Sequence, residues 1–316
     1  MARSRVFRLT SAVAVLAAVG AAAGSGVPAS ARPSPDRSPQ QAAACGAFFD
    51  DFNYSSRTDP AFTARDWSIR TSAGGPGVGG ATWSASNISF PVVDGQKSLQ
   101  LRATTNGTAA GTTHAQVQQN RQRFFEGTYA TRFKFSDTPV SGADGDTINQ
   151  TFYTISPLRY DWDPIYSELD ISEYLPNGGW GETSATNFFT SWNTYQADPF
   201  DGWRATTARR QSHAGWHTLV ATVSGGHVKY YVDGTLVADH TTDSAGRTVY
   251  PRQAMTLNYN QWFIDLTGHT GGTSVWAQSA DWVYYAKNEV LSPSAAVARV
   301  SSYRSAGRTH ADTISC

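Results

Sequence analysis

The sequence predicts an all-β fold, and three observations lead to this prediction. Short apolar runs alternate with turn residues from about residue 48 onward, and no long amphipathic helical pattern interrupts them. The 28 Gly residues supply many turns between such runs. Ten Trp, 14 Tyr and 15 Phe provide the bulky apolar groups that fill the cores of β-sandwiches. We therefore expect two large antiparallel sheets that pack face to face.

Individual strands can be placed from their apolar runs and from the turn residues between them. They are expected at residues 81–90, 98–103, 114–120, 127–135, 149–155, 168–174, 184–192, 216–223, 228–232, 236–240, 255–260 and 280–286. Between the strands at 228–232 and 236–240 lies Asp233-Gly234, a pair that accepts the positive φ angles of a tight hairpin turn. Residues 74–80 contain five Gly and one Pro and are expected to form a loop. No repeat of about 20–50 residues is visible, which argues against a propeller.

Charge and hydropathy exclude several functional classes. The 25 Lys and Arg residues balance 25 Asp and Glu residues, which argues against a nucleic-acid-binding protein. No apolar run approaches the ~18–20 residues that a transmembrane helix needs. Apolar residues still make up 40% of the chain, which is enough for a sizeable core. What remains is a soluble, aromatic-rich protein.

The N-terminal segment has the features of a secretory signal peptide. Three Arg residues precede an apolar run over residues 12–23, and a small-residue cleavage site follows at residues 29–31. The alternative is a short amphipathic helix. The expected organisation is a signal peptide at 1–31, a linker at 32–46, a single folded domain at 47–292 and a C-terminal tail at 293–316. We therefore expect a secreted, extracellular protein.

The two Cys residues lie near the two ends of the mature chain, Cys45 and Cys316. A disulfide bond between them is expected, because secretion exposes thiols to an oxidising compartment and chain termini are often close in single domains. The alternatives are two free thiols or pairing with another chain.

The most informative stretch of the chain carries Glu168, Asp170 and Glu173 within six residues. In a strand, alternate side chains share a face, so Glu168 and Asp170 point the same way. Strict alternation would place Glu173 on the opposite face. A one-residue β-bulge at residues 171–172 would bring it back beside Asp170. The spacing therefore predicts three carboxylates on one face of a bulged strand.

Neighbouring carboxylates raise one another's pKa, so such a strand is costly unless a proton is shared. Glycoside hydrolysis uses this arrangement, because a retaining enzyme needs a carboxylate nucleophile and a protonated carboxyl about 5–5.5 Å apart. The Cα atoms of Glu168 and Glu173 would lie about 13 Å apart, and their side chains can close that gap. Asp170 between them can hydrogen-bond the nucleophile. The alternatives are a merely acidic exposed face or a bound cation, although no EF-hand loop is present.

At these residues the chain resembles glycoside hydrolase family 16. The segment Glu168-Leu-Asp170-Ile-Ser-Glu173 matches the family's E-x-D-x-x-E active-site motif. Other segments resemble family strands in the same order, namely residues 83–89, 98–102, 126–134, 216–218, 231–234 and 281–285. The likeness covers roughly residues 48–291.

The resemblance implies a β-jelly-roll sandwich of two curved antiparallel sheets, with a substrate cleft across the concave face. It implies retaining, endo-acting hydrolysis of β-linked polysaccharide, with Glu168 as nucleophile, Glu173 as general acid/base and Asp170 as assisting acid. Ser167 differs from the Gly or Asp that glucanase members usually carry, which leaves the substrate open. No cofactor or catalytic metal is required, and a structural calcium ion is plausible by resemblance, with ligands that the sequence does not name.

Candidate sugar contacts are aromatic and polar residues beside the expected cleft strands. Aromatic rings stack on the apolar C–H faces of sugars, and amides or guanidinium groups bond their hydroxyls. The candidates are Trp162, Trp180, Trp262, Asn187, Asn258, Asn260 and Arg132. Asn187 and Arg132 are included because they resemble family residues near the cleft. Each Trp has core packing as its alternative, and Arg132 has a surface ion pair.

The leading functional hypothesis is a secreted endo-glycosidase that acts on β-1,3- or β-1,3-1,4-glucan. A β-galactanase of the agarase or carrageenase type is the second, and only the Arg-rich stretch at residues 204–210 would suit a sulfated substrate. A lectin-like glycan-binding sandwich is the non-catalytic alternative, but a binder has no use for three carboxylates that repel one another. We expect a polysaccharide substrate, a monomer, and neither a nucleic-acid nor a membrane partner after signal removal.

Overall fold

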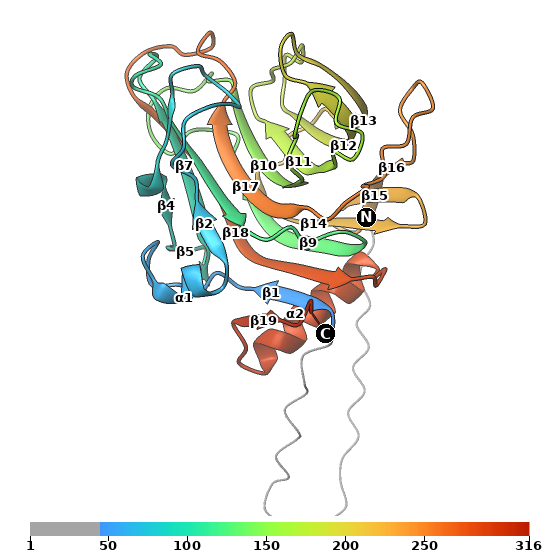
Figure 1. The fold of residues 1–316 in the computed structure, drawn as a ribbon. Coiled ribbons are helices and arrows are strands. Elements are labelled where there is room, and N and C mark those ends of the chain that lie inside the picture. The colour runs from blue at the N-terminus through green and yellow to red at the C-terminus, as the bar shows by residue number, and fades with distance from the viewer. Residues whose placement is uncertain (1–44, 316) are drawn as a thin grey trace, which may run out of the picture. The chain divides into compact units, whose positions relative to one another are not determined.

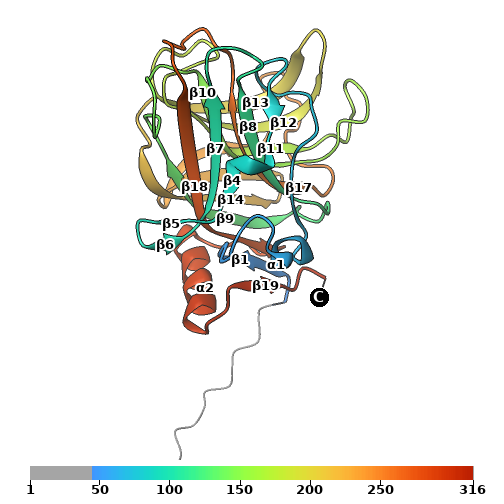
Figure 2. The same ribbon diagram turned by 90° about the vertical axis from the view of Figure 1, so that its left-hand side faces the viewer.

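Two curved β-layers stacked on each other form the body of the protein (Figures 1 and 2). The computed structural model describes residues 45–315. Seventeen of its strands are hydrogen-bonded into one continuous system, which folds over into the two layers. The expected fold class, an all-β sandwich of antiparallel sheets with jelly-roll character, is therefore confirmed. The predicted signal peptide lies outside the described residues.

The inner layer contains seven strands, all paired antiparallel. In spatial order they are β2 (Trp67–Ile69), β8 (Thr113–Gln119), β17 (Thr256–Phe263), β10 (Ile148–Ile155), β11 (Glu168–Leu175), β12 (Thr186–Gln196) and β13 (Asp201–Arg209). Strand β11 carries the acidic segment and lies between β10 and β12, well inside the layer. Its side chains are therefore held by neighbours on both sides.

The outer layer is built around the longest strand, β18 (Ser274–Lys287), which pairs with β7, β9 and β1. The remaining strands are β1 (Ala47–Asp50), β4 (Ile88–Ser89), β7 (Leu99–Thr105), β9 (Gly127–Phe135), β14 (Gly215–Ser224), β15 (His227–Val232), β16 (Thr235–His240) and β19 (His310–Asp312). Strand β3 (Thr82–Trp83) runs parallel to β8, and β5 (Val92–Val93) pairs with β6 (Gln96–Lys97) separately.

The main hydrophobic core lies between the two layers. Leu169 and Ile171 of β11 are buried there together with Phe133 and Phe135 of β9. The ring of Tyr174 packs edge-on against Phe135, with ring centroids 5.0 Å apart. Because these β11 residues face the core, the residues that alternate with them face the opposite side of the inner layer.

A second, smaller core covers the outer layer from outside. Helix α2 (Pro293–Ser305) places Val300 and Tyr303 against this face, and Tyr303 stacks on Phe49 with ring centroids 5.0 Å apart. The segment expected as a C-terminal tail at 293–316 thus lies on the outside of the outer layer and includes a helix that the sequence analysis did not specify. Its apolar residues do not form one clear stripe, since Ala296, Val300 and Tyr303 are buried but Val297 is 36% exposed, so no amphipathic pattern marks the helix in the sequence. The available signal was Ser292, whose side chain caps the helix just before a proline.

Most expected strands are present, with boundaries that shift by a few residues, but one expected strand is broken and several elements were not expected, among them the short strands β1, β2 and β19. The strand expected at 81–90 is broken into β3, a 3₁₀ turn at Ala85–Asn87 and β4. Strand β13 was missed, because it lies at the edge of the inner layer and carries few apolar residues. The hairpin prediction is confirmed, since Asp233 has φ 50° and Gly234 has φ 82° between β15 and β16. Short helix α1 (Pro60–Ala64) was also not expected.

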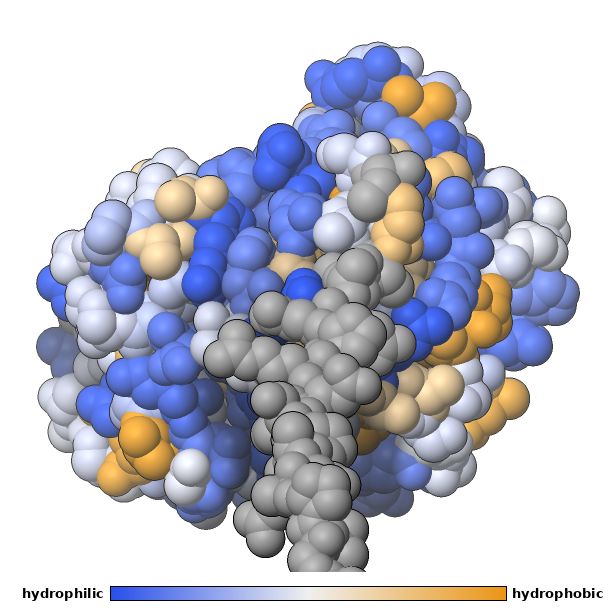
Figure 3. Space-filling view, turned by 90° about the horizontal axis from the view of Figure 1, so that it is seen from below, coloured by the Kyte–Doolittle hydropathy of each residue, from blue (hydrophilic) through white to orange (hydrophobic). Residues whose placement is uncertain are grey.

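The surface seen from the α2 side is mostly hydrophilic, and its hydrophobic side chains form small separate patches where the view colours them (Figure 3). No helix within residues 45–315 is long and apolar enough to cross a membrane.

The ends of the described chain lie side by side. The backbone N–H of Gly46 donates to the carbonyl of Thr313 at 2.8 Å, and Thr313 in turn donates to the carbonyl of Ala47 at 2.7 Å. The predicted disulfide partner Cys316 lies outside the described residues. The proximity of its neighbours supports the pairing with Cys45, which stays a prediction.

We expect thiol titration of the denatured, unreduced protein to find no free thiol. In the chain-entropy model, a bond that closes a loop of about 270 residues stabilises the fold by about 5 kcal/mol, less any strain. Reduction should therefore lower the melting temperature, and replacing both Cys residues by Ser should reproduce the loss. Two free thiols in the untreated protein would contradict the pairing.

Candidate active site

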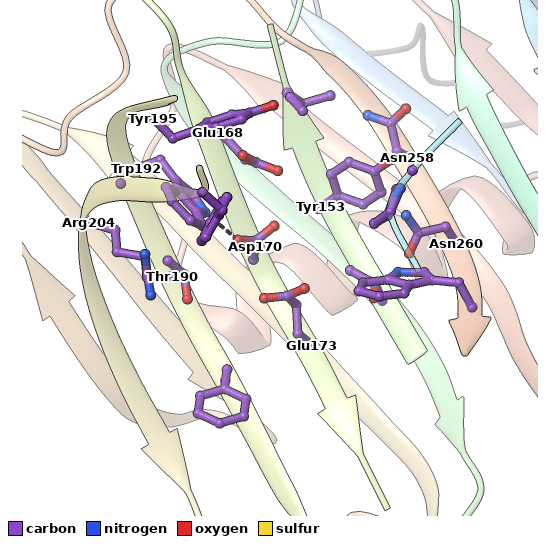
Figure 4. Close-up of a pocket in the computed structure, with 18 of the residues that line it drawn as sticks. Tyr153, Glu168, Asp170, Glu173, Thr190, Trp192, Tyr195, Arg204, Asn258 and Asn260 are labelled. Atoms are coloured by element: carbon purple, nitrogen blue, oxygen red, sulfur yellow. Dashed lines mark hydrogen bonds between the residues drawn. The ribbon is translucent and has the colours of Figure 1, made fainter. Parts of the chain in front are cut away.

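A cleft of 1270 Å³ crosses the exposed face of the inner layer. Its lining comes from six neighbouring strands, β8, β17, β10, β11, β12 and β13, together with the loops at their ends. This volume exceeds the roughly 300–1,000 Å³ of a typical small-molecule pocket, so the cleft is large enough for several units of a polymer. Glu168, Asp170 and Glu173 all line it (Figure 4).

A β-bulge in β11 brings the three carboxylates to one face, as the spacing predicted. On β10, Tyr153 pairs with Asp170 and its neighbour Phe152 pairs with Ser172, so Ile171 has no partner. The register with β12 shifts at the same place. The extra residue resets the alternation of side chains, and Glu173 therefore returns to the cleft face.

Each carboxylate has its own hydrogen-bond donor. The hydroxyl of Tyr166 donates to Glu168 through a short contact. The indole Nε1 of Trp192 donates to Asp170 Oδ2 at 2.7 Å, and the amide Nδ2 of Asn149 donates to Glu173 Oε1 at 2.8 Å. These donors fix the orientation of three side chains that would otherwise repel one another.

Burial is the main cause that raises the pKa of all three carboxyl groups. It raises the pKa of Asp170 to about 7, against the opposing effects of the Trp192 hydrogen bond and the Arg204 charge. The pKa values of Glu168 and Glu173 lie well above the ordinary value, because burial and the neighbouring Asp170 charge both disfavour ionisation. Near neutral pH the strand therefore retains protons, and a carboxylic acid is available beside a carboxylate.

Four of the predicted sugar-contact residues line the cleft, namely Trp180, Trp262, Asn258 and Asn260. The rings of Trp180 and Trp262 lie 6.0 Å apart at their centroids, and Trp180 is 49% exposed. Gly77 leaves room for the Trp262 ring, because a Cβ atom at this position would lie 2.9 Å from that ring and 2.6 Å from a backbone oxygen.

Three predicted residues lie elsewhere, and these predictions were wrong about position. Trp162 itself has a left-handed backbone conformation with φ 62°, and its ring packs at a tilt against Trp203, with ring centroids 4.6 Å apart, outside the cleft lining. Asn187 faces the core, because it pairs with the core residue Tyr174 across the bulged register. Arg132 belongs to β9 in the outer layer, where its Nη1 bonds Asp281 at 2.9 Å.

Other cleft residues were missed by sequence reasoning. Tyr166 could have been found from the sequence. It lies two residues before Glu168, and residues two apart in an extended chain point to the same face. Trp192 stood among the Trp residues beside the expected cleft strands, and Arg204 begins the Arg-rich stretch at 204–210. Their position beside the acidic strand could not be predicted, since it depends on the register of β11, β12 and β13. Further cleft residues that carried no sequence signal are Arg70, Gln116, Gln118, Tyr153, Tyr195 and Phe200.

Among residues 45–315, no group of three or more His, Cys, Asp or Glu side chains could hold a metal ion. The carboxylate of Asp281 bonds the guanidinium groups of Arg132 and Arg304. The ligands of the calcium ion that the resemblance allows thus stay unassigned, and no step below depends on a metal.

Comparisons with solved structures agree with this architecture. A β-glucanase of Bacillus licheniformis shares 18% identity, with a TM-score of 0.54, over 77% of this chain and 98% of its own. A prokaryotic β-1,3-1,4-glucanase (lichenase) from a mouse hindgut metagenome shares 20% identity, with a TM-score of 0.52, over 76% of this chain and 98% of its own. These likenesses show a shared fold.

A third structure is a variant of LamA from Zobellia galactanivorans, in complex with laminaritriose and laminaritetraose. It shares 16% identity, with a TM-score of 0.51, over 77% of this chain and 99% of its own. No curated protein sequence matches the chain. The sequence profile described as "Glycosyl hydrolases family 16" matches residues 80–284, which is most of the chain and includes the acidic strand. The protein therefore belongs to glycosyl hydrolase family 16 and is a glycoside hydrolase of the retaining type that characterises this family.

Proposed function

We propose that the protein is a secreted, monomeric endo-glycosidase that cleaves β-1,3- or β-1,3-1,4-glucan. One observation carries the catalytic part of this proposal. Glu168, Asp170 and Glu173 share one face of β11 at the cleft, each with a separate donor. The lining, which is drawn from six neighbouring strands, supports endo action, because a polymer can lie across the strands without presenting an end.

In the first step, the Glu173 carboxylic acid gives its proton to the glycosidic oxygen, and the leaving sugar departs. The Glu168 carboxylate attacks the anomeric carbon and forms a glycosyl ester. In the second step, ionised Glu173 takes a proton from water, which attacks the same carbon and releases Glu168. Two displacements on one carbon retain the anomeric configuration. Burial and the neighbouring Asp170 charge keep the pKa of Glu173 high, which holds the acid protonated until it is used.

The cleft lining supports a neutral glucan as the substrate. The amides of Gln116, Gln118, Asn258 and Asn260 can bond sugar hydroxyls without adding charge. The exposed ring of Trp180 offers a surface for an apolar sugar face. Two of the solved structures above are called β-glucanases, and a third holds laminari-oligosaccharides, which favours this substrate class.

A charged β-galactan of the carrageenan type is the second candidate. It is favoured by Arg204, an exposed cleft residue whose guanidinium forms no hydrogen bond or ion pair with the residues that the structure describes. A sulfate ester could occupy that guanidinium.

A panel of purified polysaccharides tests the substrate. We expect new reducing ends from laminarin or mixed-linkage β-glucan, with a rapid fall in viscosity and, by proton NMR, a β-anomeric product. Agarose and carrageenan serve as the galactan arm. Cleavage of agarose or carrageenan alone would show that the substrate is a β-galactan and not a glucan. An α-anomeric first product would contradict the assignment of Glu168 as nucleophile.

A further inference from the structure

Asp170 depends on one indole for its hydrogen bonding. Within residues 45–315, Trp192 is the residue whose side chain bonds the Asp170 carboxylate. Figure 4 shows this bond and places Trp192 and Arg204 on the same side of Asp170. Any group that fixes the position of the indole therefore also fixes the position of the carboxylate between the two catalytic Glu residues.

Strand β13 holds the indole in place. Trp192 pairs directly with Arg204 in the β12–β13 register, and the guanidinium lies over the indole ring, 4.7 Å from its centroid. Gly202 presses on the same ring, since a Cβ atom there would lie 2.5 Å from Trp192 Cζ3. Phe200 packs edge-on at 6.2 Å between ring centroids. The indole therefore has little freedom to turn away from Asp170.

No acidic side chain among the described residues forms an ion pair with Arg204. Arg70, the other cleft arginine, bonds the side chain of Gln116 and the backbone carbonyls of residues 72–75. The Arg204 guanidinium forms no ion pair or hydrogen bond with the described part of the chain, and it lies over the rings of Trp192 and Phe200. Its positive charge therefore acts mainly on the acidic strand.

We propose that Arg204 is a positioning residue for this reaction. Its guanidinium holds the Trp192 indole against Asp170, and its charge favours the ionised forms of Asp170 and Glu173. Arg204 thus sets the pH range in which Glu173 can act as an acid. This role rests on the proposed assignment of Glu168, Asp170 and Glu173 as the catalytic set.

The sign of the expected change follows from the groups around Asp170. They are Glu168 and Glu173 on its own strand, Arg204 from β13, Tyr153 from β10, Tyr230 from β15 and Tyr166 from the preceding loop. Arg204 is the nearby cation that lowers the pKa of Asp170 and of Glu173. Removing its charge raises both pKa values, so Glu173 keeps its proton to a higher pH.

Arg204→Gln tests this role with a neutral glucan as substrate. The alkaline limb of the kcat/KM profile should move upward by about half a pH unit, the size expected for one partly solvated charge. Arg204→Lys keeps the charge and should restore the wild-type limb. The control is Arg209→Gln, which removes a charge from the opposite face of β13, outside the cleft lining.

A second measurement does not depend on turnover. The indole N–H of Trp192 reports ionisation of Asp170, so its ¹⁵N-edited NMR signal should titrate with a higher midpoint in Arg204→Gln than in wild type. An unchanged midpoint and pH limb, or an equal shift in Arg209→Gln, would overturn the proposal. A raised KM for carrageenan with an unmoved pH profile would also overturn it and would make Arg204 a substrate ligand. If the midpoint moves but neither glucan nor galactan is cleaved, the proposed substrate fails, while the action of Arg204 on Asp170 through Trp192 is still shown.

Discussion

Glu168→Ala is expected to lower turnover of every glycan that the wild type cleaves by more than about 10⁴-fold, because the covalent glycosyl-enzyme cannot form. The substitution also removes the acceptor of the Tyr166 hydroxyl but leaves the β11 register, which depends on backbone bonds, intact. Thermal unfolding should therefore change little compared with the loss of activity.

Added azide distinguishes a missing nucleophile from a damaged cleft. The space left by the Glu168 side chain admits a small anion, which can attack the anomeric carbon of an activated aryl glycoside. We expect partial recovery of activity and a glycosyl azide of inverted configuration. Glu289→Ala, which removes an exposed Glu paired with Arg299, is the matched control and should keep full activity. Full activity of Glu168→Ala would contradict the role of the acidic strand as a whole.

Glu173→Gln should separate substrates by their leaving groups. The Gln side chain can still accept the Asn149 hydrogen bond through its amide oxygen, so the cleft geometry is retained. Hydrolysis of a natural glucan should fall by about 10²–10⁴-fold, because its poor leaving oxygen requires a proton. An aryl glycoside with an acidic phenol needs little protonation, so its first step should survive.

The consequence for that aryl substrate is a build-up of the glycosyl-enzyme. Its second step lacks the base that activates water, so intact-protein mass spectrometry should detect one glycosyl unit added to Glu173→Gln, on the peptide that contains Glu168. Azide should release the adduct with net retention of configuration. An equal loss of activity on both substrates, with no adduct, would contradict the role of Glu173 as acid and base.

Local sequence rules predicted the central part of the site. The bulge follows from three acidic residues at an irregular spacing, because only an extra residue can place all of them on one face. The core positions Leu169 and Ile171 follow from the same alternation. These features depend on a single strand, so the sequence of that strand is sufficient to derive them.

What was missed depends on contacts between strands that are distant in sequence. Asn149 reaches Glu173 from β10, and Trp192 reaches Asp170 from β12, through registers that no local pattern determines. Trp162 was placed wrongly because an aromatic residue near a motif can point either into the cleft or against another ring. The sequence does not decide between these two positions, and in the structure Trp162 packs against Trp203. Strand β13 lacks apolar alternation, because an edge strand beside a polar cleft does not need it.

The pairing of β1 with β19 also decides how the protein responds to a pulling force. Because these strands are antiparallel, Ala47 at the start of β1 lies beside Thr313, just after β19. A force that pulls the two chain ends apart thus acts at one edge of the pair and opens its hydrogen bonds one after another, like a zipper. A covalent bond between Cys45 and Cys316 would lie outside the first of these hydrogen bonds. This bond would carry the applied force, so the hydrogen bonds between β1 and β19 would not be loaded.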